Sequence, residues 1–280
     1  MITEISSSNH SYSDEIEGLV RRFNDTGYIV LDDVFERTYI DELRTAYNLL
    51  IETYLSDNGG IGALDGKTFG LKHVGCHPAL SSPWADSQIV CNPRADAVLT
   101  ALLGLDYQCG YYHSNAAYPG SGVQGIHRDV KPLFTGEELS VPHPVTSIVL
   151  NIPLCDFTEE NGSTEVWPGT HLWVDRSPAD GQRLDVRAAS IPSERTNVKA
   201  GALILRDLRM FHRGMPNRSS EVRAMLSIVY VRSFRVTGVL EIPQSTWEGW
   251  PERTRSIFRN NSIVSDSSVS SPYRITKTSQ

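Results

Sequence analysis

The chain has 280 residues, of which 40% are hydrophobic and 21% are charged, and both fractions are typical of a soluble globular protein. The 26 basic and 33 acidic side chains give a formal net charge of −7, which provides no basic field for nucleic acid or anionic lipid. The first residues lack the basic start and apolar run of a secretory signal, and no window is apolar enough to span a bilayer, so a cytoplasmic protein is expected.

The first part of the chain predicts helices around one short strand. Apolar residues recur at helical spacing from about Asp14 to Thr26 and from about Thr38 to Ser56, with an apolar strand from Tyr28 to Leu31 between them. The segment from Asp57 to Ser87 is rich in glycine and has no steady period, which indicates a long loop of functional type. A third helix is expected from Pro93 to Leu103.

The character changes after Leu105 to short β-rich runs that Gly, Pro and Asn separate, as in an antiparallel sandwich or barrel. The predicted strands are 107–117, 145–154, 164–167, 202–205 and 223–234. Helices followed by strands predict a mainly β, α+β fold with one contiguous sheet system. We expect a single domain over residues 1–260 and a flexible, serine-rich tail over residues 261–280.

A His-x-Asp motif in the segment from Gln124 to Asp129 is the first sign of a metal site. In an extended chain, His127 and Asp129 project from the same side, and His212, which directly follows a predicted strand, can add a third ligand. Two histidines and one carboxylate form the facial set of non-haem iron(II) and leave coordination positions open. A His-x-Asp pair also occurs by chance, so this interpretation depends on further residues.

Three further features support the metal interpretation. Arg223 opens a strongly apolar strand eleven residues after His212, where its guanidinium needs an anionic partner such as a dicarboxylate; the alternative is a solvated arginine at a strand end. The run from Asn161 to His171 predicts a turn, a short strand and a second turn. Gln124 can donate an amide hydrogen bond to a ligand beside the metal, or else it is a solvated loop residue.

These motifs, in this order, resemble those of the phytanoyl-CoA dioxygenase family of iron(II)/2-oxoglutarate-dependent oxygenases, which includes members that tailor natural products. The resemblance covers about Tyr28 to Arg232. It includes Gln-x-x-His-x-Asp, then Asn-Gly-x-Thr followed by Pro-Gly-x-His, then the distal histidine with its arginine. Each piece is common, but the ordered set is specific.

The resemblance implies a double-stranded β-helix, or jelly roll, with the N-terminal helices on its outer face. It implies that His127 and Asp129 end one strand, that His212 ends another, and that the three residues hold Fe(II) as the catalytic metal ligands. His171 is interpreted as part of a turn and not as a fourth ligand. Four further histidines have no partner at the spacing expected of metal ligands, so we expect them to be structural or substrate-facing; they are His73, His77, His113 and His143.

The resemblance also implies the co-substrates and the reaction. Arg223 would bind the distal carboxylate of 2-oxoglutarate, with Thr164 and Gln124 as supporting hydrogen-bond donors, and O2 would be the second co-substrate. The implied reaction hydroxylates a small molecule of natural-product type, or otherwise oxidises it by desaturation, epoxidation, cyclisation or epimerisation, and releases succinate and CO2. Related halogenases have Ala or Gly where this chain has Asp129, so halogenation is not expected.

Two other classes of function stay open from the residues alone. One is a jelly-roll hydrolase or isomerase that uses zinc or manganese and does not need Arg223. The other is a non-catalytic binding relative in which the ligand set is only structural. We expect a monomer or homodimer, and we expect the long loop with Phe69 and Trp84, together with residues 130–143, to form the lid and wall of a substrate pocket.

Overall fold

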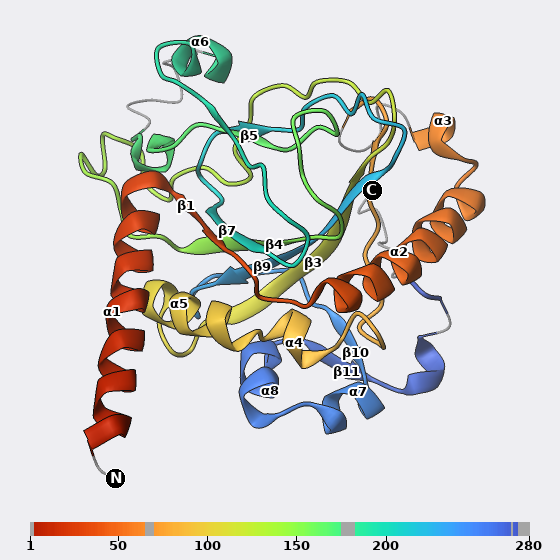
Figure 1. Ribbon diagram of the computed structural model, residues 1–280, viewed down its shortest axis with the longest axis horizontal. Coiled ribbons are helices and arrows are strands. Elements are labelled where there is room, and N and C mark those ends of the chain that lie inside the picture. The colour runs from red at the N-terminus through yellow and green to blue at the C-terminus, as the bar shows by residue number, and fades with distance from the viewer. Residues whose placement is uncertain (1–2, 65–69, 175–182, 270, 274–280) are drawn as a thin grey trace.

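A six-stranded antiparallel sheet forms the centre of the protein in the computed structural model, which describes residues 3–64, 70–174, 183–269 and 271–273 (Figure 1). Its strand order is β1-β7-β4-β9-β3-β2. The strands are β1 (Tyr28–Leu31), β2 (His73–Val74), β3 (Gln108–Ala117), β4 (Ser147–Pro153), β7 (Leu203–Asp207) and β9 (Arg223–Val231). Strands far apart in the chain are therefore neighbours, as in a jelly roll.

A second, smaller sheet faces the first. It has the order β6-β5-β8, with β5 (Glu165–Val166) between β6 (Glu194–Arg195) and β8 (His212–Arg213), and both of its pairings are antiparallel. Figure 1 shows β5 and its connecting loops on one side of the large sheet and α4 and α5 on the other. The mainly β, α+β arrangement predicted from the sequence is present.

Helices cover the other face of the large sheet: α2 (Arg37–Asp57), α4 (Ser87–Val90) and α5 (Pro93–Leu103), with α1 (Thr3–Thr26) at one edge (Figure 1). The start of α5 follows from its sequence, because the Asn92 side chain accepts hydrogen bonds from the first free backbone N–H groups and Pro93 needs no such bond. Gly104, with a φ of 97°, ends the helix.

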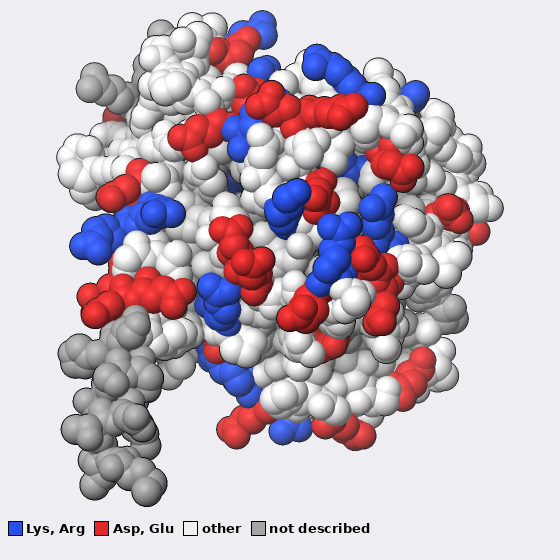
Figure 2. Space-filling model, in the orientation of Figure 1, with Lys and Arg blue, Asp and Glu red and all other residues white. Residues whose placement is uncertain are grey.

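The remaining elements are short. They are α3 (Ile61–Leu64), η1 (Thr170–Leu172), α6 (Leu184–Ala188), β10 (Glu241–Pro243), α7 (Gln244–Gly249), α8 (Glu252–Phe258), β11 (Ser262–Val264) and η3 (Asp266–Ser268). Within the part of the chain that the structure describes, no helix is both long enough and apolar enough to cross a bilayer. Acidic and basic side chains are interspersed on the face drawn in Figure 2.

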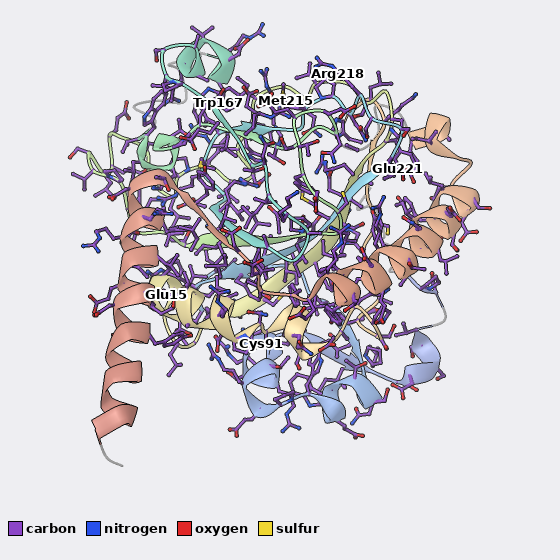
Figure 3. The ribbon with its side chains drawn as sticks, in the orientation of Figure 1. Glu15, Cys91, Trp167, Met215, Arg218 and Glu221 are labelled. Carbon is purple, nitrogen blue, oxygen red and sulfur yellow. The ribbon has the colours of Figure 1, made fainter. Side chains whose placement is uncertain are left out.

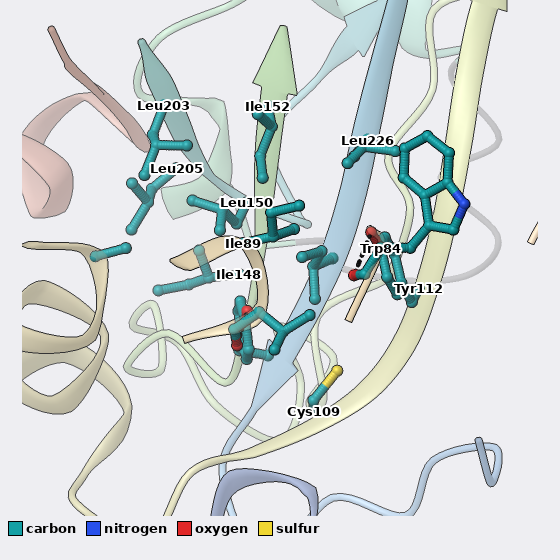
Figure 4. Close-up of a cluster of buried hydrophobic side chains, with 14 of the residues drawn as sticks. Trp84, Ile89, Cys109, Tyr112, Ile148, Leu150, Ile152, Leu203, Leu205 and Leu226 are labelled. Carbon is teal, nitrogen blue, oxygen red and sulfur yellow. Dashed lines mark hydrogen bonds between the residues drawn. The ribbon is translucent and has the colours of Figure 1, made fainter. Parts of the chain in front are cut away.

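Alternate residues of each central strand point to opposite sides of the large sheet. On the helix side, the large side chains of β4 and β9 are at most 1% exposed: Ile148, Leu150, Ile152, Leu226, Ile228 and Tyr230. Figure 4 labels Ile148, Leu150, Ile152 and Leu226 of this layer. On the other side, residues between them line a cavity: Val149, Asn151, Met225, Ser227 and Val229. The helix side forms the hydrophobic core, and the other side forms a cavity wall.

Two segments differ from the sequence-based expectations. The expected loop over residues 57–87 contains α3 and β2 in its described part. The described part of the segment expected to be a tail packs onto the protein: β11 pairs in parallel with β10, and Tyr273, which is 8% exposed, donates a hydrogen bond to Asp57 at 2.7 Å. Short elements of this kind have too few residues to show a period.

Candidate metal centre

Backbone hydrogen bonds hold two distant segments together at the site. The N–H of His127 donates to the carbonyl of His212 at 3.0 Å, and the N–H of His212 donates back at 2.9 Å. The N–H of Asp129 donates to the carbonyl of Leu208 at 2.9 Å. The ligand atoms of His127, Asp129 and His212 consequently lie within 4.8 Å of one another.

The local structure around these ligands differs in one respect from the expectation. His127 makes only an isolated bridge to His212, so His127 and Asp129 do not end a regular strand. His212 begins the two-residue strand β8 and does not end a strand. The short extended segment at His127–Asp129 still projects alternate side chains to one side. The His-x-Asp spacing is therefore enough to place both side chains toward the candidate metal position.

A buried ion pair orders the turn that leads to His212. Arg209 donates to both carboxylate oxygens of Asp207, with the shortest distance 2.6 Å, and the two side chains are 4% and 1% exposed. Arg209 also donates to the backbone carbonyl of His143 at 2.8 Å. Phe211 N–H donates to the Thr170 hydroxyl at 2.9 Å, so the turn is anchored on both sides before His212 begins.

A backbone carbonyl lies beside Nδ1 of each histidine. Nδ1 of His127 lies 2.9 Å from the carbonyl oxygen of Gly125, and Nδ1 of His212 lies 3.1 Å from that of Met210. A carbonyl oxygen only accepts, so the bond at His127 requires a proton on Nδ1 and leaves the lone pair on Nε2. At His212 the same Nδ1 also lies 3.1 Å from Nη1 of Arg206, which only donates, so the two contacts favour opposite tautomers. Nε2 of His212 faces Oδ1 of Asp129 at 3.5 Å, so Nε2 is the ring nitrogen that points into the ligand cluster.

The protonation states also suit a metal. Burial raises the pKa of Asp129, but the positive charge and the hydrogen bond of Arg206 outweigh this effect and lower the pKa to about 2, so the carboxylate is ionised at neutral pH. Burial and the positive charge of Arg206 lower the pKa of His212 to about 3, so the imidazole is neutral. An ionised carboxylate and neutral imidazoles are the forms that coordinate a divalent metal.

Arg206, at the end of β7, contacts two members of the cluster. Its Nη2 donates to Oδ2 of Asp129 at 2.7 Å, and its Nη1 lies 3.1 Å from Nδ1 of His212. The Arg206 side chain is 8% exposed, and that of Asp129 is 35% exposed. The carboxylate therefore has one oxygen facing the His212 imidazole and the other held by a buried guanidinium.

Arg223 is a second buried arginine, and its charge has no carboxylate partner among the described residues. It is 1% exposed, its Nε has no hydrogen-bond partner, and Nη1 lies 3.8 Å from the sulfur of Met225. Its guanidinium stacks 4.9 Å from the Phe157 ring. Burial lowers the pKa of Arg223 to about 10, which leaves it charged at neutral pH. Such a buried charge is costly unless an anion pairs with it.

One cavity of about 440 Å³ contains the three ligands and Arg223. The pairing register of the strands shows in which direction the cavity extends over the large sheet. Arg206, which touches Asp129, lies opposite Val149, and Val149 and Tyr111 both lie opposite Val229. Arg223 lies six residues earlier on β9, so the cavity extends from the metal ligands and the 40%-exposed Tyr111 inward to the guanidinium.

A sequence profile of the phytanoyl-CoA dioxygenase family matches residues 23–225. The chain belongs to this family. Curated relatives include the dioxygenase trt7 of Aspergillus terreus, which is 32% identical over 51% of this chain and 48% of the relative. The iron/alpha-ketoglutarate-dependent dioxygenase ausO of Aspergillus calidoustus is 27% identical over 71% of this chain and 64% of the relative. The chain thus spans about half the length of trt7 and somewhat less than two thirds of ausO.

Solved structures confirm the predicted jelly-roll fold for this member of the phytanoyl-CoA dioxygenase family. The epimerase SnoN from nogalamycin biosynthesis has 20% sequence identity and a TM-score of 0.58, over 81% of this chain and 88% of SnoN. HygX from Streptomyces hygroscopicus, solved with nickel, 2-oxoglutarate and hygromycin B, has 17% identity and a TM-score of 0.57, over 80% and 90% of the two chains. At this identity the likeness concerns the fold.

The structure brings every site residue expected from the sequence to the same cavity. Thr164 and Gln124 line it together with the three ligands and Arg223. The Gln124 side-chain oxygen also accepts a hydrogen bond from Gly214 N–H at 2.7 Å, two residues after His212, so Gln124 ties its own segment to β8. The coordinating and anion-binding roles of these residues stay predictions.

The other histidines have separate places. His171 is 3% exposed, lies 3.0 Å from the carbonyl oxygen of Asn24, and packs so closely on Gly27 that a Cβ there would be 2.6 Å from its ring. It therefore fastens the turn between α1 and β1, and it lies in the short helix η1 and outside the candidate ligand cluster. His143 accepts a hydrogen bond from Leu133 N–H, His73 lies 2.7 Å from the Gly122 carbonyl oxygen, and His113 lines the cavity beside the ring of His77.

The expected pocket wall is only partly as predicted. Val130 lines the cavity, but Trp84 is 4% exposed and lies in the helix-side core (Figure 4). Phe69 lies outside the described residues. Gly162, in the Asn-Gly turn, has a φ of +82°, and a Cβ there would lie 2.5 Å from the carbonyl oxygen of Met215, which explains the glycine. Figure 3 labels Met215 and, nearby, Trp167.

Sequence reasoning missed Arg206 and the Asp207–Arg209 pair. The signal for Arg206 was available, because it follows the apolar residues Leu203 to Leu205 in a strand, just as Arg223 adjoins an apolar strand. Two residues on the cavity face of β3 were also missed: Tyr111 and Asn115 line the cavity beside His113, which was expected to be structural or substrate-facing. Alternation along the strand predicts that these three share a face but not which face encloses a ligand.

Proposed function

We propose that the protein is an iron(II)- and 2-oxoglutarate-dependent dioxygenase that oxidises a small molecule, most directly by hydroxylation. His127, Asp129 and His212 would hold the metal, since two imidazoles and one carboxylate on one face suit Fe(II) and leave positions open. Bound iron would supply the activation of O2, coupled to the decarboxylation of 2-oxoglutarate to succinate and CO2.

Arg223 is the observation that carries this proposal. It is a buried charge without a carboxylate partner among the described residues, and it faces the same cavity as the candidate ligands. A guanidinium presents a planar pair of donors that matches a carboxylate, so Arg223 would hold the distal carboxylate of 2-oxoglutarate. Thr164 and Gln124 would donate supporting hydrogen bonds. A zinc or manganese hydrolase would leave the burial of Arg223 without a purpose.

The protein residues would position the reactants and limit access of water. The ionised carboxylate of Asp129 occupies the ligand position that a halide needs in related halogenases, which favours hydroxylation over halogenation. The apolar walls at Val149 and Val229 would keep water away from the metal.

The substrate is proposed to be a small molecule of natural-product type. The cavity volume of about 440 Å³ suits one small molecule beside the co-substrate, and a nucleic acid is not expected. Two structural neighbours support this substrate class, since SnoN comes from nogalamycin biosynthesis and HygX was solved with hygromycin B bound. A monomer or homodimer stays the expected oligomeric state, and light scattering measures it.

Anaerobic titration tests the proposed function. Fe(II) followed by 2-oxoglutarate should produce the visible charge-transfer absorption that a chelating 2-oxo acid gives on ferrous iron. In air, the same protein should release succinate, at a rate that rises with the correct member of a panel of natural products. If the absorption is missing and no succinate forms with any member, the protein is not a 2-oxoglutarate oxygenase.

A further inference from the structure

Arg206 is a buried arginine that lines the cavity and contacts a candidate metal ligand. It lies on β7, opposite Val149 of β4, and its side chain is 8% exposed and lines the cavity. Its Nη2 donates to Oδ2 of Asp129 at 2.7 Å. This ion pair is part of the cavity wall at the candidate metal centre, and not of the helix-side core.

The two oxygens of Asp129 therefore have different surroundings. Oδ1 lies 3.5 Å from Nε2 of His212, which is the atom that faces the ligand cluster. Oδ2 is turned toward Arg206. A metal next to Nε2 of His212 would meet Oδ1 first, while Oδ2 is already bound by a charged donor, and hydrogen bonds from a guanidinium to a carboxylate are among the strong ones.

We propose that Arg206 is a positioning residue that makes Asp129 a single-oxygen ligand. The inference rests on the proposed metal site. A six-coordinate centre with three protein ligands has three positions left, and a chelating 2-oxo acid and O2 need all three. If Asp129 bound through both oxygens, one of these positions would be lost. Arg206 prevents this by holding Oδ2 and by partly balancing the carboxylate charge.

A merely structural ion pair would behave differently. Arg213 provides the matched case, because it donates to Glu165 at 2.6 Å, follows His212 directly, and stacks 5.4 Å from the Trp167 ring. Glu165 is not a candidate metal ligand. Breaking the Arg213–Glu165 pair removes a part-buried guanidinium–carboxylate pair beside the site without freeing an oxygen of Asp129.

Cobalt(II) is a suitable probe, because its visible absorption reports coordination number without turnover. Wild-type protein, Arg206→Gln, Arg206→Lys and Arg213→Gln are titrated anaerobically with Co(II), and each Co(II)-loaded protein is then titrated with 2-oxoglutarate. For Arg206→Gln we expect the dissociation constant of Co(II) to rise about 10- to 100-fold, the usual effect of losing a partner of a metal ligand. Its Co(II) spectrum should change, and its binding of 2-oxoglutarate should weaken.

The comparison variants sharpen the result. Arg206→Lys should restore most of the wild-type affinity and spectrum, because an ammonium group can still donate to Oδ2. Arg213→Gln should match the wild type. If Arg206→Gln is unfolded by circular dichroism, Arg206→Met, which keeps the apolar stem without donors, replaces it.

The outcomes separate this inference from the proposed function. A wild-type protein that does not bind Co(II) would overturn both. A wild-type protein that binds Co(II), with an Arg206→Gln variant of unchanged affinity and spectrum, would overturn only the role of Arg206. Equal losses in Arg206→Gln and Arg213→Gln would also overturn it, because they would show a general effect of removing a nearby ion pair.

Discussion

The two faces of the large sheet use the same strands for different purposes. On β9 the helix-side residues Leu226 and Ile228 are fully buried among apolar neighbours. Their chain neighbours Ser227 and Val229 are only partly buried and line the cavity. Strand β4 repeats this contrast, since Asn151 donates a hydrogen bond to Ser227 at 2.8 Å on the cavity side.

Within a single strand, the helix-side residues therefore contribute to stability and the cavity-side residues contribute to ligand binding. A side chain on the helix side contributes by removing apolar surface from water and by close packing. A side chain on the cavity side contributes little packing because space for a ligand lies in front of it. Substitutions one residue apart should therefore affect different properties, and the four predictions below compare the cavity side with the helix side.

The largest effect is expected at the metal centre. Asp129→Ala removes the only carboxylate of the candidate ligand set and leaves Arg206 without its partner. Iron binding and succinate formation should fall to below about 1% of wild type, a larger loss than the 10- to 100-fold typical of supporting residues. Iron content and succinate release measure this, with circular dichroism as the control for folding. Because a halide can take the place of the carboxylate in related halogenases, the variant is tested in halide-free buffer, where retention of one iron per chain would contradict the ligand assignment.

A smaller but clear effect is expected on the helix side. Ile228→Ala empties space in the buried layer and should lower the free energy of unfolding by about 2–5 kcal/mol, with iron binding retained at low temperature. The matched control Val229→Ala, one residue later on the cavity side, should cost about 1 kcal/mol and should change the response to substrate. Urea denaturation of the two variants compares them. Equal losses of stability would contradict the division between the faces.

Arg223 lies at the inner end of the cavity face. Arg223→Ala should raise the dissociation constant of 2-oxoglutarate about 100-fold, since hydrogen bonds to charged groups contribute about 1.5–3 kcal/mol. The affinity for the metal should be nearly unchanged because Arg223 is not a candidate ligand. Anaerobic titrations of the two ligands measure this. Equal weakening of metal and 2-oxoglutarate would show that Arg223 supports the whole site and does not bind the diacid.

The smallest effect is expected within the helix layer, at Asp96 of α5. Arg253 of α8 donates to Asp96 at 2.7 Å, and Tyr107 donates at 2.8 Å. Burial raises the pKa of Asp96, but the hydrogen bonds from Arg253 and Tyr107 outweigh it, so the pKa in the folded protein is lowered. Ionised Asp96 therefore stabilises the fold above its unfolded pKa of about 3.9, and this stabilisation disappears as pH falls through the lower, folded value.

Asp96→Asn tests this pH dependence. At pH 7 the variant should be less stable than wild type by about 1 kcal/mol, and the difference should shrink only below about pH 4. Urea denaturation between pH 7 and pH 3 measures it. A difference that is constant over this range would mean that the charge of Asp96 contributes nothing. Binding of 2-oxoglutarate at pH 7 should not change, because Asp96 is remote from the cavity face.

Long periodic segments, and the cluster of His127, Asp129 and His212 as a candidate ligand set, were predictable from the sequence. The helix at Pro93–Leu103 was predicted with its observed bounds, and β1 likewise, because capping residues and apolar patterns are local signals. His212 and Arg223 were recognised through their spacing in an ordered set of motifs. Each of these predictions depends on residues close together in the chain or on a motif order.

The rest depends on contacts between distant segments. The two-residue strands β6 and β8 exist because they pair with β5, and no period can be read from two residues. The contact of Arg206 with Asp129 joins residues far apart in the chain, so local patterns do not predict it. The pair of backbone hydrogen bonds between His127 and His212 likewise joins distant segments and can be seen only in the structure.

The depth of Arg223 has a consequence for the order in which molecules arrive and leave. Arg223 is 1% exposed at the inner end, whereas Tyr111 at the outer end is 40% exposed. Under the proposed function, 2-oxoglutarate must pass the outer end of the cavity before the substrate to be oxidised occupies that end. The two molecules therefore enter in a fixed order. Succinate, formed at the inner end, must then depart last. Steady-state kinetics should accordingly show succinate as a competitive inhibitor against 2-oxoglutarate, because both molecules bind the same form of the enzyme.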